Sequence, residues 1–180
     1  MKHFSSGSLS LVLALAASTP VSAQAAPPDL SDPEVAHVAV TANSIDIELA
    51  RVAMTKADNA EVKAFARTMI TDHSAVNGQA AALAGRLGVT PRDNPVSQLL
   101  LTGAQAARAS LEKLRGRAFD RAYVDREVAY HQAVLDALDS LLIPTTDNAE
   151  LKKLLVDVRP AIATHLAHAK ALQGSLADDR

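Results

Sequence analysis

The stretch from residue 60 to residue 87, AEVKAFARTMITDHSAVNGQAAALAGRL, decides the fold class of this chain. Its apolar side chains recur at intervals of three and four residues, which places them on one face of an α-helix. An Asp-Asn pair precedes the stretch and Gly88 follows it, as is typical of a helix start and a helix end. The stretch therefore predicts one long amphipathic helix. Its apolar face consists of Val62, Phe65, Met69, Val76, Ala80, Leu83 and Leu87.

Four further segments have a helical pattern, and their start and stop signals place them at 33–57, 95–115, 119–142 and 149–176. The short breaks at 58–59 and 143–148 join neighbouring helices into two antiparallel hairpins. The segment from 88 to 118 is long enough to cross the bundle between the hairpins. Two hairpins with one long crossover form the ferritin-like arrangement of a four-helix bundle. A five-helix up-and-down array fits the same pattern and remains the alternative.

The composition agrees with an all-α domain, which we place at residues 32–177. The chain has 180 residues, 48% hydrophobic residues and only 3% aromatic ones. Ala and Leu dominate the apolar set, and this mix favours helices over strands. A net charge of −2 provides no basic surface, so no nucleic-acid partner is expected. The absence of cysteine excludes disulfides, thiolate metal ligands and a cysteine nucleophile, and no motif identifies a catalytic residue.

Residues 1–23 have the pattern of a secretory signal peptide. Lys2 precedes the apolar run LSLVLALAA at 9–17, and the small residues before the cut predict cleavage after Ala23. The run is about half the roughly 20 residues that a membrane span needs. Residues 24–31 are predicted to be a disordered leader. We therefore expect a periplasmic or secreted protein whose mature chain has no membrane span, with its partners unidentified and a homo-oligomer possible.

Each long helix has an ionisable side chain in its apolar face: Glu48, His73, His131 and His165, in chain order. A buried charge costs several kcal/mol unless it is paired or bound to a metal. Counting from the turns, the two members of each hairpin are offset by roughly 7–9 Å. Helical side chains lean toward the N-terminus, and this direction brings both pairs together. Glu127, one turn before His131, is closer to the level of His165 and is a fifth candidate.

Three imidazoles and a carboxylate suit zinc, iron, manganese or copper. The sequence therefore predicts one transition-metal ion between the helices, held by the four residues just named. Glu127 and Asp72 are additional candidate ligands, although Asp72 could instead orient an imidazole by accepting a hydrogen bond. The alternative is a metal-free hydrogen-bond network of buried His and Glu side chains that fixes the register of the helices.

Four stretches around these residues are characteristic together: IDIELARVA at 45–53, VKAFARTMITDH at 62–73, FDRAYVDREVAYH at 119–131 and RPAIATHLAHA at 159–169. They resemble the domain-of-unknown-function family 4142, exported bacterial proteins of the ferritin-like superfamily. The resemblance covers roughly residues 33–173. It implies a periplasmic four-helix bundle and no assigned reaction. Asp120 and Tyr123 belong to the same pattern, and we expect Asp120 to cap a helix start.

Ferritin-like di-iron enzymes use a Glu from each of two helices and a Glu-x-x-His motif from each of the other two. Here Ile70 stands three residues before His73, and Ile162 stands three before His165. Both expected bridging carboxylates are missing, which favours a mononuclear, histidine-rich site. Three hypotheses follow: a metal-binding protein for metal handling or stress protection, a non-catalytic structural or interaction module, and a metal-dependent oxidoreductase.

Overall fold

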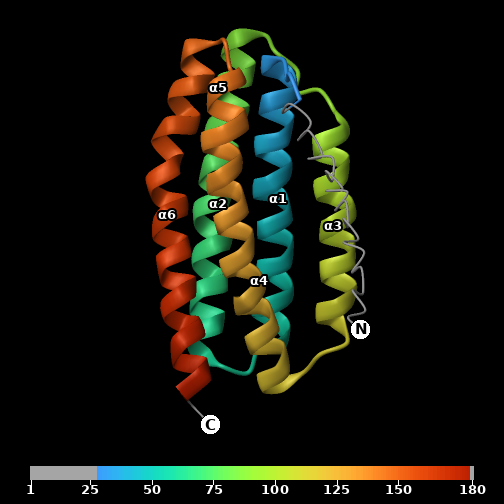
Figure 1. Cartoon of the computed structure of the whole chain (residues 1–180), viewed down its shortest axis with the longest axis vertical. Coiled ribbons are helices and arrows are strands. Elements are labelled where there is room, and N and C mark those ends of the chain that lie inside the picture. Colours follow the sequence, from blue (N-terminus) through green and yellow to red (C-terminus); the bar gives the residue numbers. More distant parts are fainter. Residues whose placement is uncertain (1–27, 179–180) are drawn as a thin grey trace, which may run out of the picture.

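A computed structural model describes residues 28–178, which form helices and contain no strand (Figure 1). The predicted signal peptide and residues 24–27 of the predicted leader lie outside this range. No helix in the described part of the chain is long and apolar enough to cross a membrane. The elements are α1 (Asp32–Lys56), α2 (Ala60–Leu87), α3 (Pro95–Glu112), α4 (Gly116–Ala137), η1 (Leu138–Leu142), α5 (Ile143–Thr145) and α6 (Ala149–Asp178).

The helices form two antiparallel hairpins joined by a helical crossover, as the sequence predicts. α1 packs mainly on α2, and α4 packs mainly on α6. α3 runs back along the outside of α1 and connects the end of α2 to the start of α4 (Figure 1). We call the end with the α5–α6 turn the upper end and the end with the α1–α2 turn the lower end. α4 continues into η1, a wider turn in which Ile143 N–H bonds to Leu138 O.

An aspartate from the opposite hairpin holds each of the two hairpin turns. Asp120, near the start of α4, accepts the backbone N–H groups of Asp58 and Asn59 at 3.1 and 3.0 Å. Asp32, the first residue of α1, accepts the two corresponding N–H groups of the upper turn at 2.9 Å each. Asp120 therefore caps the turn of the other hairpin, whereas we expected it to cap the start of its own helix.

The two turns also share the sequence Asp-Asn-Ala-Glu, at 58–61 and at 147–150. In both, the asparagine caps the following helix through its side-chain oxygen. Asn59 Oδ1 accepts from two N–H groups of α2 at 2.8 and 3.1 Å. Asn148 Oδ1 accepts from two N–H groups of α6 at 3.0 Å each. The hairpins thus use the same device to reverse the chain at opposite ends of the bundle.

The start of the domain lies slightly before the predicted boundary. Leu30 lies within the predicted leader, residues 24–31, but its side chain is buried in the upper core. Ser31 is the residue that precedes α1, and its N–H donates to Glu34 Oε2 at 2.9 Å. The leader prediction is therefore wrong for these two residues, because burial of Leu30 contributes to the apolar core.

Two apolar clusters fill the bundle, one toward each end. The lower cluster contains the buried aromatic side chains Phe65, Phe119 and Tyr123. The upper cluster is aliphatic and includes Val35, Leu138 and other Leu, Val and Ile side chains. A layer of buried ionisable side chains lies between the two clusters along the bundle axis. This layer contains Asp46, His73, Glu127, His131 and His165.

We expect Asp120→Ala to lower the free energy of unfolding by about 2 kcal/mol, because two N–H groups lose a charged acceptor. Urea unfolding of the metal-free protein measures this. Asp125→Ala is the matched control, since Asp125 lies on the same helix, is exposed and accepts only from the Gln173 side chain. An equal cost for the two substitutions would contradict the role assigned to Asp120.

Candidate metal centre

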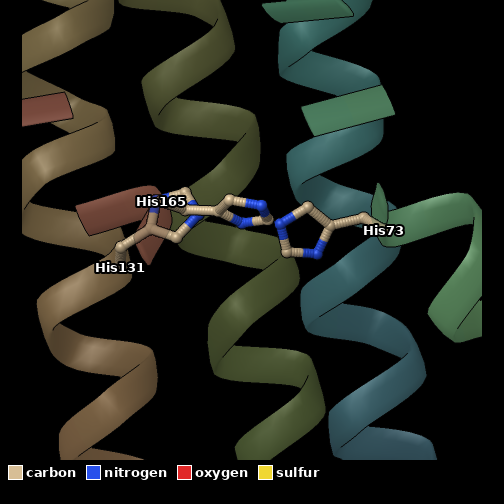
Figure 2. Close-up of side chains that lie close together, drawn as sticks. All are labelled: His73, His131 and His165. Carbon is tan, nitrogen blue, oxygen red and sulfur yellow. The ribbon is translucent and has the colours of Figure 1, made fainter. Parts of the chain in front are cut away.

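Three histidines from three different helices converge in the polar layer. His73 comes from α2, His131 from α4 and His165 from α6, and their rings point toward one another (Figure 2). One ring nitrogen from each can be chosen so that all three lie within 4.8 Å of one another. All three side chains are buried. The convergence that the apolar-face pattern predicts for these three residues is therefore present.

Each imidazole is held through one nitrogen, and the other nitrogen is buried without a hydrogen-bond partner. His73 Nδ1 lies 2.7 Å from Asn43 Oδ1, and His131 Nδ1 lies 2.9 Å from the Glu127 carbonyl oxygen. His165 Nε2 lies 2.9 Å from Asp72 Oδ2. These three partner atoms are acceptors, so in a neutral ring the held nitrogen carries the proton. The remaining nitrogens, all unpartnered, then present lone pairs: His73 Nε2, His131 Nε2 and His165 Nδ1.

The spacing of the rings fits one shared ion. With a metal–nitrogen bond of about 2.1 Å and a ring centre about 1.1 Å further out, three imidazoles on one ion have centres roughly 5.2–5.5 Å apart. The ring centres of His73 and His165 are 5.3 Å apart, and those of His131 and His165 are 5.5 Å apart. The centres of His73 and His131 are 5.8 Å apart. The three rings thus need only a small adjustment to bind the same ion.

Asp46 of α1 supplies a carboxylate on one side of the histidines. Its side chain is 0% exposed, and Oδ2 lies 2.8 Å from His73 Nε2 and 3.7 Å from His131 Nε2. The 2.8 Å contact lacks the alignment of a hydrogen bond, and neither carboxylate oxygen of Asp46 has a hydrogen-bond partner. Two acceptor atoms at this separation repel each other unless a proton or a cation lies between them.

The environment keeps the Asp46 carboxyl ionised. Burial by itself raises the pKa of Asp46, but the adjacent imidazoles of His73 and His131 outweigh burial and lower that pKa to about 2. Glu127, one turn below His131, has the opposite shift. Burial raises its pKa well above the usual range, and the nearby Asp46 charge adds to this, although Arg126 opposes it. The pair thus contains one carboxylate and one carboxylic acid.

Glu127 belongs to a second, adjacent group of ionisable side chains. Its Oε2 lies 3.5 Å from His131 Nδ1, and its Oε1 lies 2.5 Å from Arg126 Nη1. Oxygens of Asp46 and Glu127 and a nitrogen of His131 can also be chosen within 4.8 Å of one another. However, Nδ1 of His131 already bonds to the Glu127 carbonyl oxygen. Glu127 therefore lies beside the three-histidine cluster and faces the nitrogen of His131 that is already bonded.

Burial also sets the charge of two of the histidines. Burial lowers the pKa of His131 to about 4, with only partial compensation from the charge on Asp46. Burial also lowers the pKa of His165, and the hydrogen bond to Asp72 partly opposes this shift. Both rings are therefore neutral at neutral pH. Neutral imidazole is the form that binds metal ions.

Glu48, the carboxylate predicted from the sequence, lies elsewhere. Its side chain is 55% exposed and pairs with Arg108 of α3, outside the bundle interior. The prediction that Glu48 lies in the interior is wrong because α1 is covered on two sides, by the bundle core and by α3. The apolar face predicted for residues 33–57, with Val38, Ala42, Ile45, Leu49 and Val52, meets α3 at Glu48. Ala50 and Ala53 are fully buried, and Asp46 lies four residues before Ala50, so including these two alanines in the face would have placed Asp46 in the interior.

The remaining residues singled out in the sequence have defined places. Asp72 is half exposed and bonds to His165, so it orients a ring, as one of its two predicted roles requires. Tyr123 is buried in the lower core, and its hydroxyl has no hydrogen-bond partner. A further histidine of α6, His168, was not among them; it lies three residues after His165, is exposed, and its ring packs edge-on against Phe65. Asn43, which orients His73, was not predicted, because nothing in its local sequence distinguishes it from a surface residue.

Comparison with known proteins gives a family and a similar fold. The family described as "Domain of unknown function (DUF4142)" matches residues 16–172. A structure described as "CopM in the Cu(II)-bound form" superposes with a TM-score of 0.61 and 16% sequence identity. The match covers 82% of this chain and 99% of that chain. At this identity the likeness extends to the fold alone. No curated protein sequence matches the chain.

The lowered pKa of His131 predicts acid sensitivity in the metal-free protein. The unfolded chain binds a proton near the ordinary histidine pKa of 6.5, whereas the folded protein does so only near 4. Stability from this group is therefore complete above about pH 6.5 and is lost as the pH falls toward 4. Relative to His131→Gln, the wild type should lose on the order of 3 kcal/mol across this window. Denaturant unfolding at several pH values with a chelator measures the difference, and parallel profiles would contradict the prediction.

Proposed function

The chain belongs to the DUF4142 family, and we propose that it binds one transition-metal ion between α1, α2, α4 and α6. The ligands are His73, His131, His165 and the carboxylate of Asp46. The observation that carries the proposal is the convergence of three unpartnered imidazole nitrogens beside an ionised, fully buried carboxylate. Buried polar atoms are nearly always satisfied, and a cation held by the three imidazole nitrogens, with Asp46 as its fourth ligand, would satisfy these groups.

The ligand chemistry supports copper(II) as the first choice. Imidazole nitrogen and carboxylate oxygen suit divalent transition metals, and among these copper(II) binds such sites most tightly. The chain has no cysteine to supply a thiolate, which a site selective for softer ions would use. The similar fold was determined with Cu(II) bound, which agrees with this choice. Zinc is the competing ion, since three histidines and a carboxylate also suit it.

The arrangement favours holding a metal over using it in a reaction. Four protein ligands complete the tetrahedral shell of zinc or the four-ligand plane of a tetragonal copper(II) site, whereas catalytic zinc sites keep one position for water or substrate. The bound ion would supply positive charge to a layer that already contains an ionised carboxylate. The chain's own residues orient the rings through Asn43, Asp72 and the Glu127 carbonyl oxygen. We therefore propose metal handling as the role, in the periplasm or outside the cell.

A metal-free polar network remains the second candidate because of one contact. A proton on His73 Nε2 would turn its 2.8 Å approach to Asp46 into an ion pair. In that case the layer would fix the register of the four helices without an ion. Such a network predicts that the histidines contribute to stability in the presence of a chelator and that no metal binds.

Untagged protein should bind one equivalent of Cu(II), detected by the visible absorption and electron paramagnetic resonance signals of nitrogen-ligated copper. His165→Ala should lower the affinity at least a hundredfold, because a ligand is lost. His168→Ala on the same helix is the matched control and should bind as the wild type does. Circular dichroism without metal shows whether each variant is folded.

A second matched pair compares Asp46, the carboxylate that we propose as a ligand, with Glu48, the one predicted from the sequence. Asp46→Asn should weaken Cu(II) binding, whereas Glu48→Gln should leave it unchanged. If folded His165→Ala and His168→Ala bind copper equally, or if the wild type binds less than a stoichiometric amount, the metal proposal fails and the polar network is favoured.

Asp72→Asn tests how far the orientation of a ring matters. Asn can still accept a hydrogen bond, but it lacks the charge that raises the basicity of the His165 ring. Affinity for Cu(II) should fall by roughly tenfold to a hundredfold, the usual effect of losing a partner of a metal-bound histidine. Competition titration against a chelator of known affinity measures this, and an unchanged affinity would show that the bond to Asp72 is incidental.

A further inference from the structure

A cavity of about 390 Å³ lies in the upper half of the bundle, directly above the histidine layer. Its floor residues each stand three or four positions from a residue of that layer, toward the upper end. Asn43 precedes Asp46, Asn77 follows His73, Val134 follows His131 and Ile162 precedes His165 in this way. One helical turn is about 5.4 Å, so the floor and the layer are adjacent.

The cavity exists because α2 presents small side chains toward α6. Ala80, Ala81 and Ala84 line it on the α2 side together with Leu83 and Leu87, and further leucines line it on the η1 and α6 side. The lower half of the bundle has the aromatic side chains of Phe65, Phe119 and Tyr123 in the corresponding interior. The upper half therefore offers apolar space that the chain's described residues do not fill.

The polar side chains that line the cavity make hydrogen bonds within the protein, and one of their buried oxygens has no partner. Asp32 accepts two backbone N–H groups, and Asn148 caps α6. Asn43 Oδ1 is the partner of His73 Nδ1. Asn77 donates to Ser44 Oγ, but its amide oxygen is buried without a partner. Since Asp32 is the one charged residue in the lining and its oxygens are used, no cation faces the space.

We propose that this cavity binds a neutral, apolar small molecule that donates one hydrogen bond to Asn77. An apolar cavity of roughly 150 Å³ holds benzene, so the present volume has room for a molecule of about 16 non-hydrogen atoms by the same scaling. The absence of a lining cation selects against an anionic head group, because a buried unpaired charge is costly. The unpartnered amide oxygen selects for a donor such as a hydroxyl or an amine N–H.

The test uses two fluorescent probes with the same aromatic skeleton. N-phenyl-1-naphthylamine is neutral, has an N–H donor and contains about 17 non-hydrogen atoms, within the range of ordinary ligand pockets. 8-Anilinonaphthalene-1-sulfonate adds a sulfonate group, which brings one negative charge and about four further non-hydrogen atoms. Titrated into untagged protein in the presence of a chelator, the neutral probe should show a saturable fluorescence increase. It should bind at least tenfold more tightly than the sulfonate.

Two alanine substitutions on α2 provide the matched control. Ala80→Leu fills the cavity and should weaken the neutral probe at least tenfold, whereas Ala82→Leu, which lies outside the lining, should not. Asn77→Ala should weaken it about threefold to tenfold, because one hydrogen bond is lost. Because the probe titration is done with a chelator present, it does not depend on metal binding. A negative result would contradict the cavity proposal and leave the metal proposal unaffected.

Four outcomes would overturn the proposal. The first is a neutral probe that does not bind the wild type, and the second is equal affinity for the two probes. The third is a dimer in sedimentation experiments that Ala80→Leu dissociates and Ala82→Leu does not, because this would assign the cavity to a second copy of the chain. Equal weakening by both leucine variants would place the probe on another surface and also contradict it.

Discussion

A fully buried carboxylate, Asp46, imposes the constraint on which the interior of this bundle depends. Removing a carboxylate from water costs several kcal/mol unless neighbouring groups compensate. Three histidines lie on the helices opposite α1, and Arg126 Nη1 lies 3.8 Å from Asp46 Oδ1. His73 and His131 are in direct reach of Asp46, and His165 completes the layer. The histidines that surround Asp46 also bring one ring nitrogen each to within 4.8 Å of one another, and a proton or a cation between these nitrogens and Asp46 offsets the buried charge.

The polar layer divides the bundle into halves that differ in packing. Below it, the aromatic side chains of Phe65 and Tyr123 pack between the helices. Above it, a cavity lined in part by alanines of α2 has its floor about one helical turn from the layer. Dense packing on one side holds the rings in place. An apolar molecule bound in the cavity, as proposed above, would lie next to the proposed metal centre, although the two proposed sites have separate ligands.

The geometry of the layer depends on the height at which each helix enters it, and the turns set those heights. Asp120 and Asp32 each fix the turn of the opposite hairpin through two backbone N–H groups. Each hairpin is thereby tied to the other at both ends of the bundle. A sliding of one hairpin past the other would break these bonds and separate the histidines of α2 from those of α4 and α6. The shared Asp-Asn-Ala-Glu turn is thus part of what positions the layer.

The sequence by itself determined the helices, the two hairpins, the crossover and the three histidines, because these follow from periodicity and from local start and stop signals. The sequence also predicted one carboxylate beside the histidines, but the residue predicted was Glu48. Only the tertiary structure placed Asp46 inside and Glu48 against Arg108, since the packing of α3 on α1 decides which face of α1 is solvent. Contacts between distant segments also determine three other features. They are the hydrogen bond of Asn43 to His73, the capping of the opposite turn by Asp120, and the cavity beside Ala80. Local sequence patterns report the conformation of one helix, whereas these features depend on how neighbouring helices are rotated against each other.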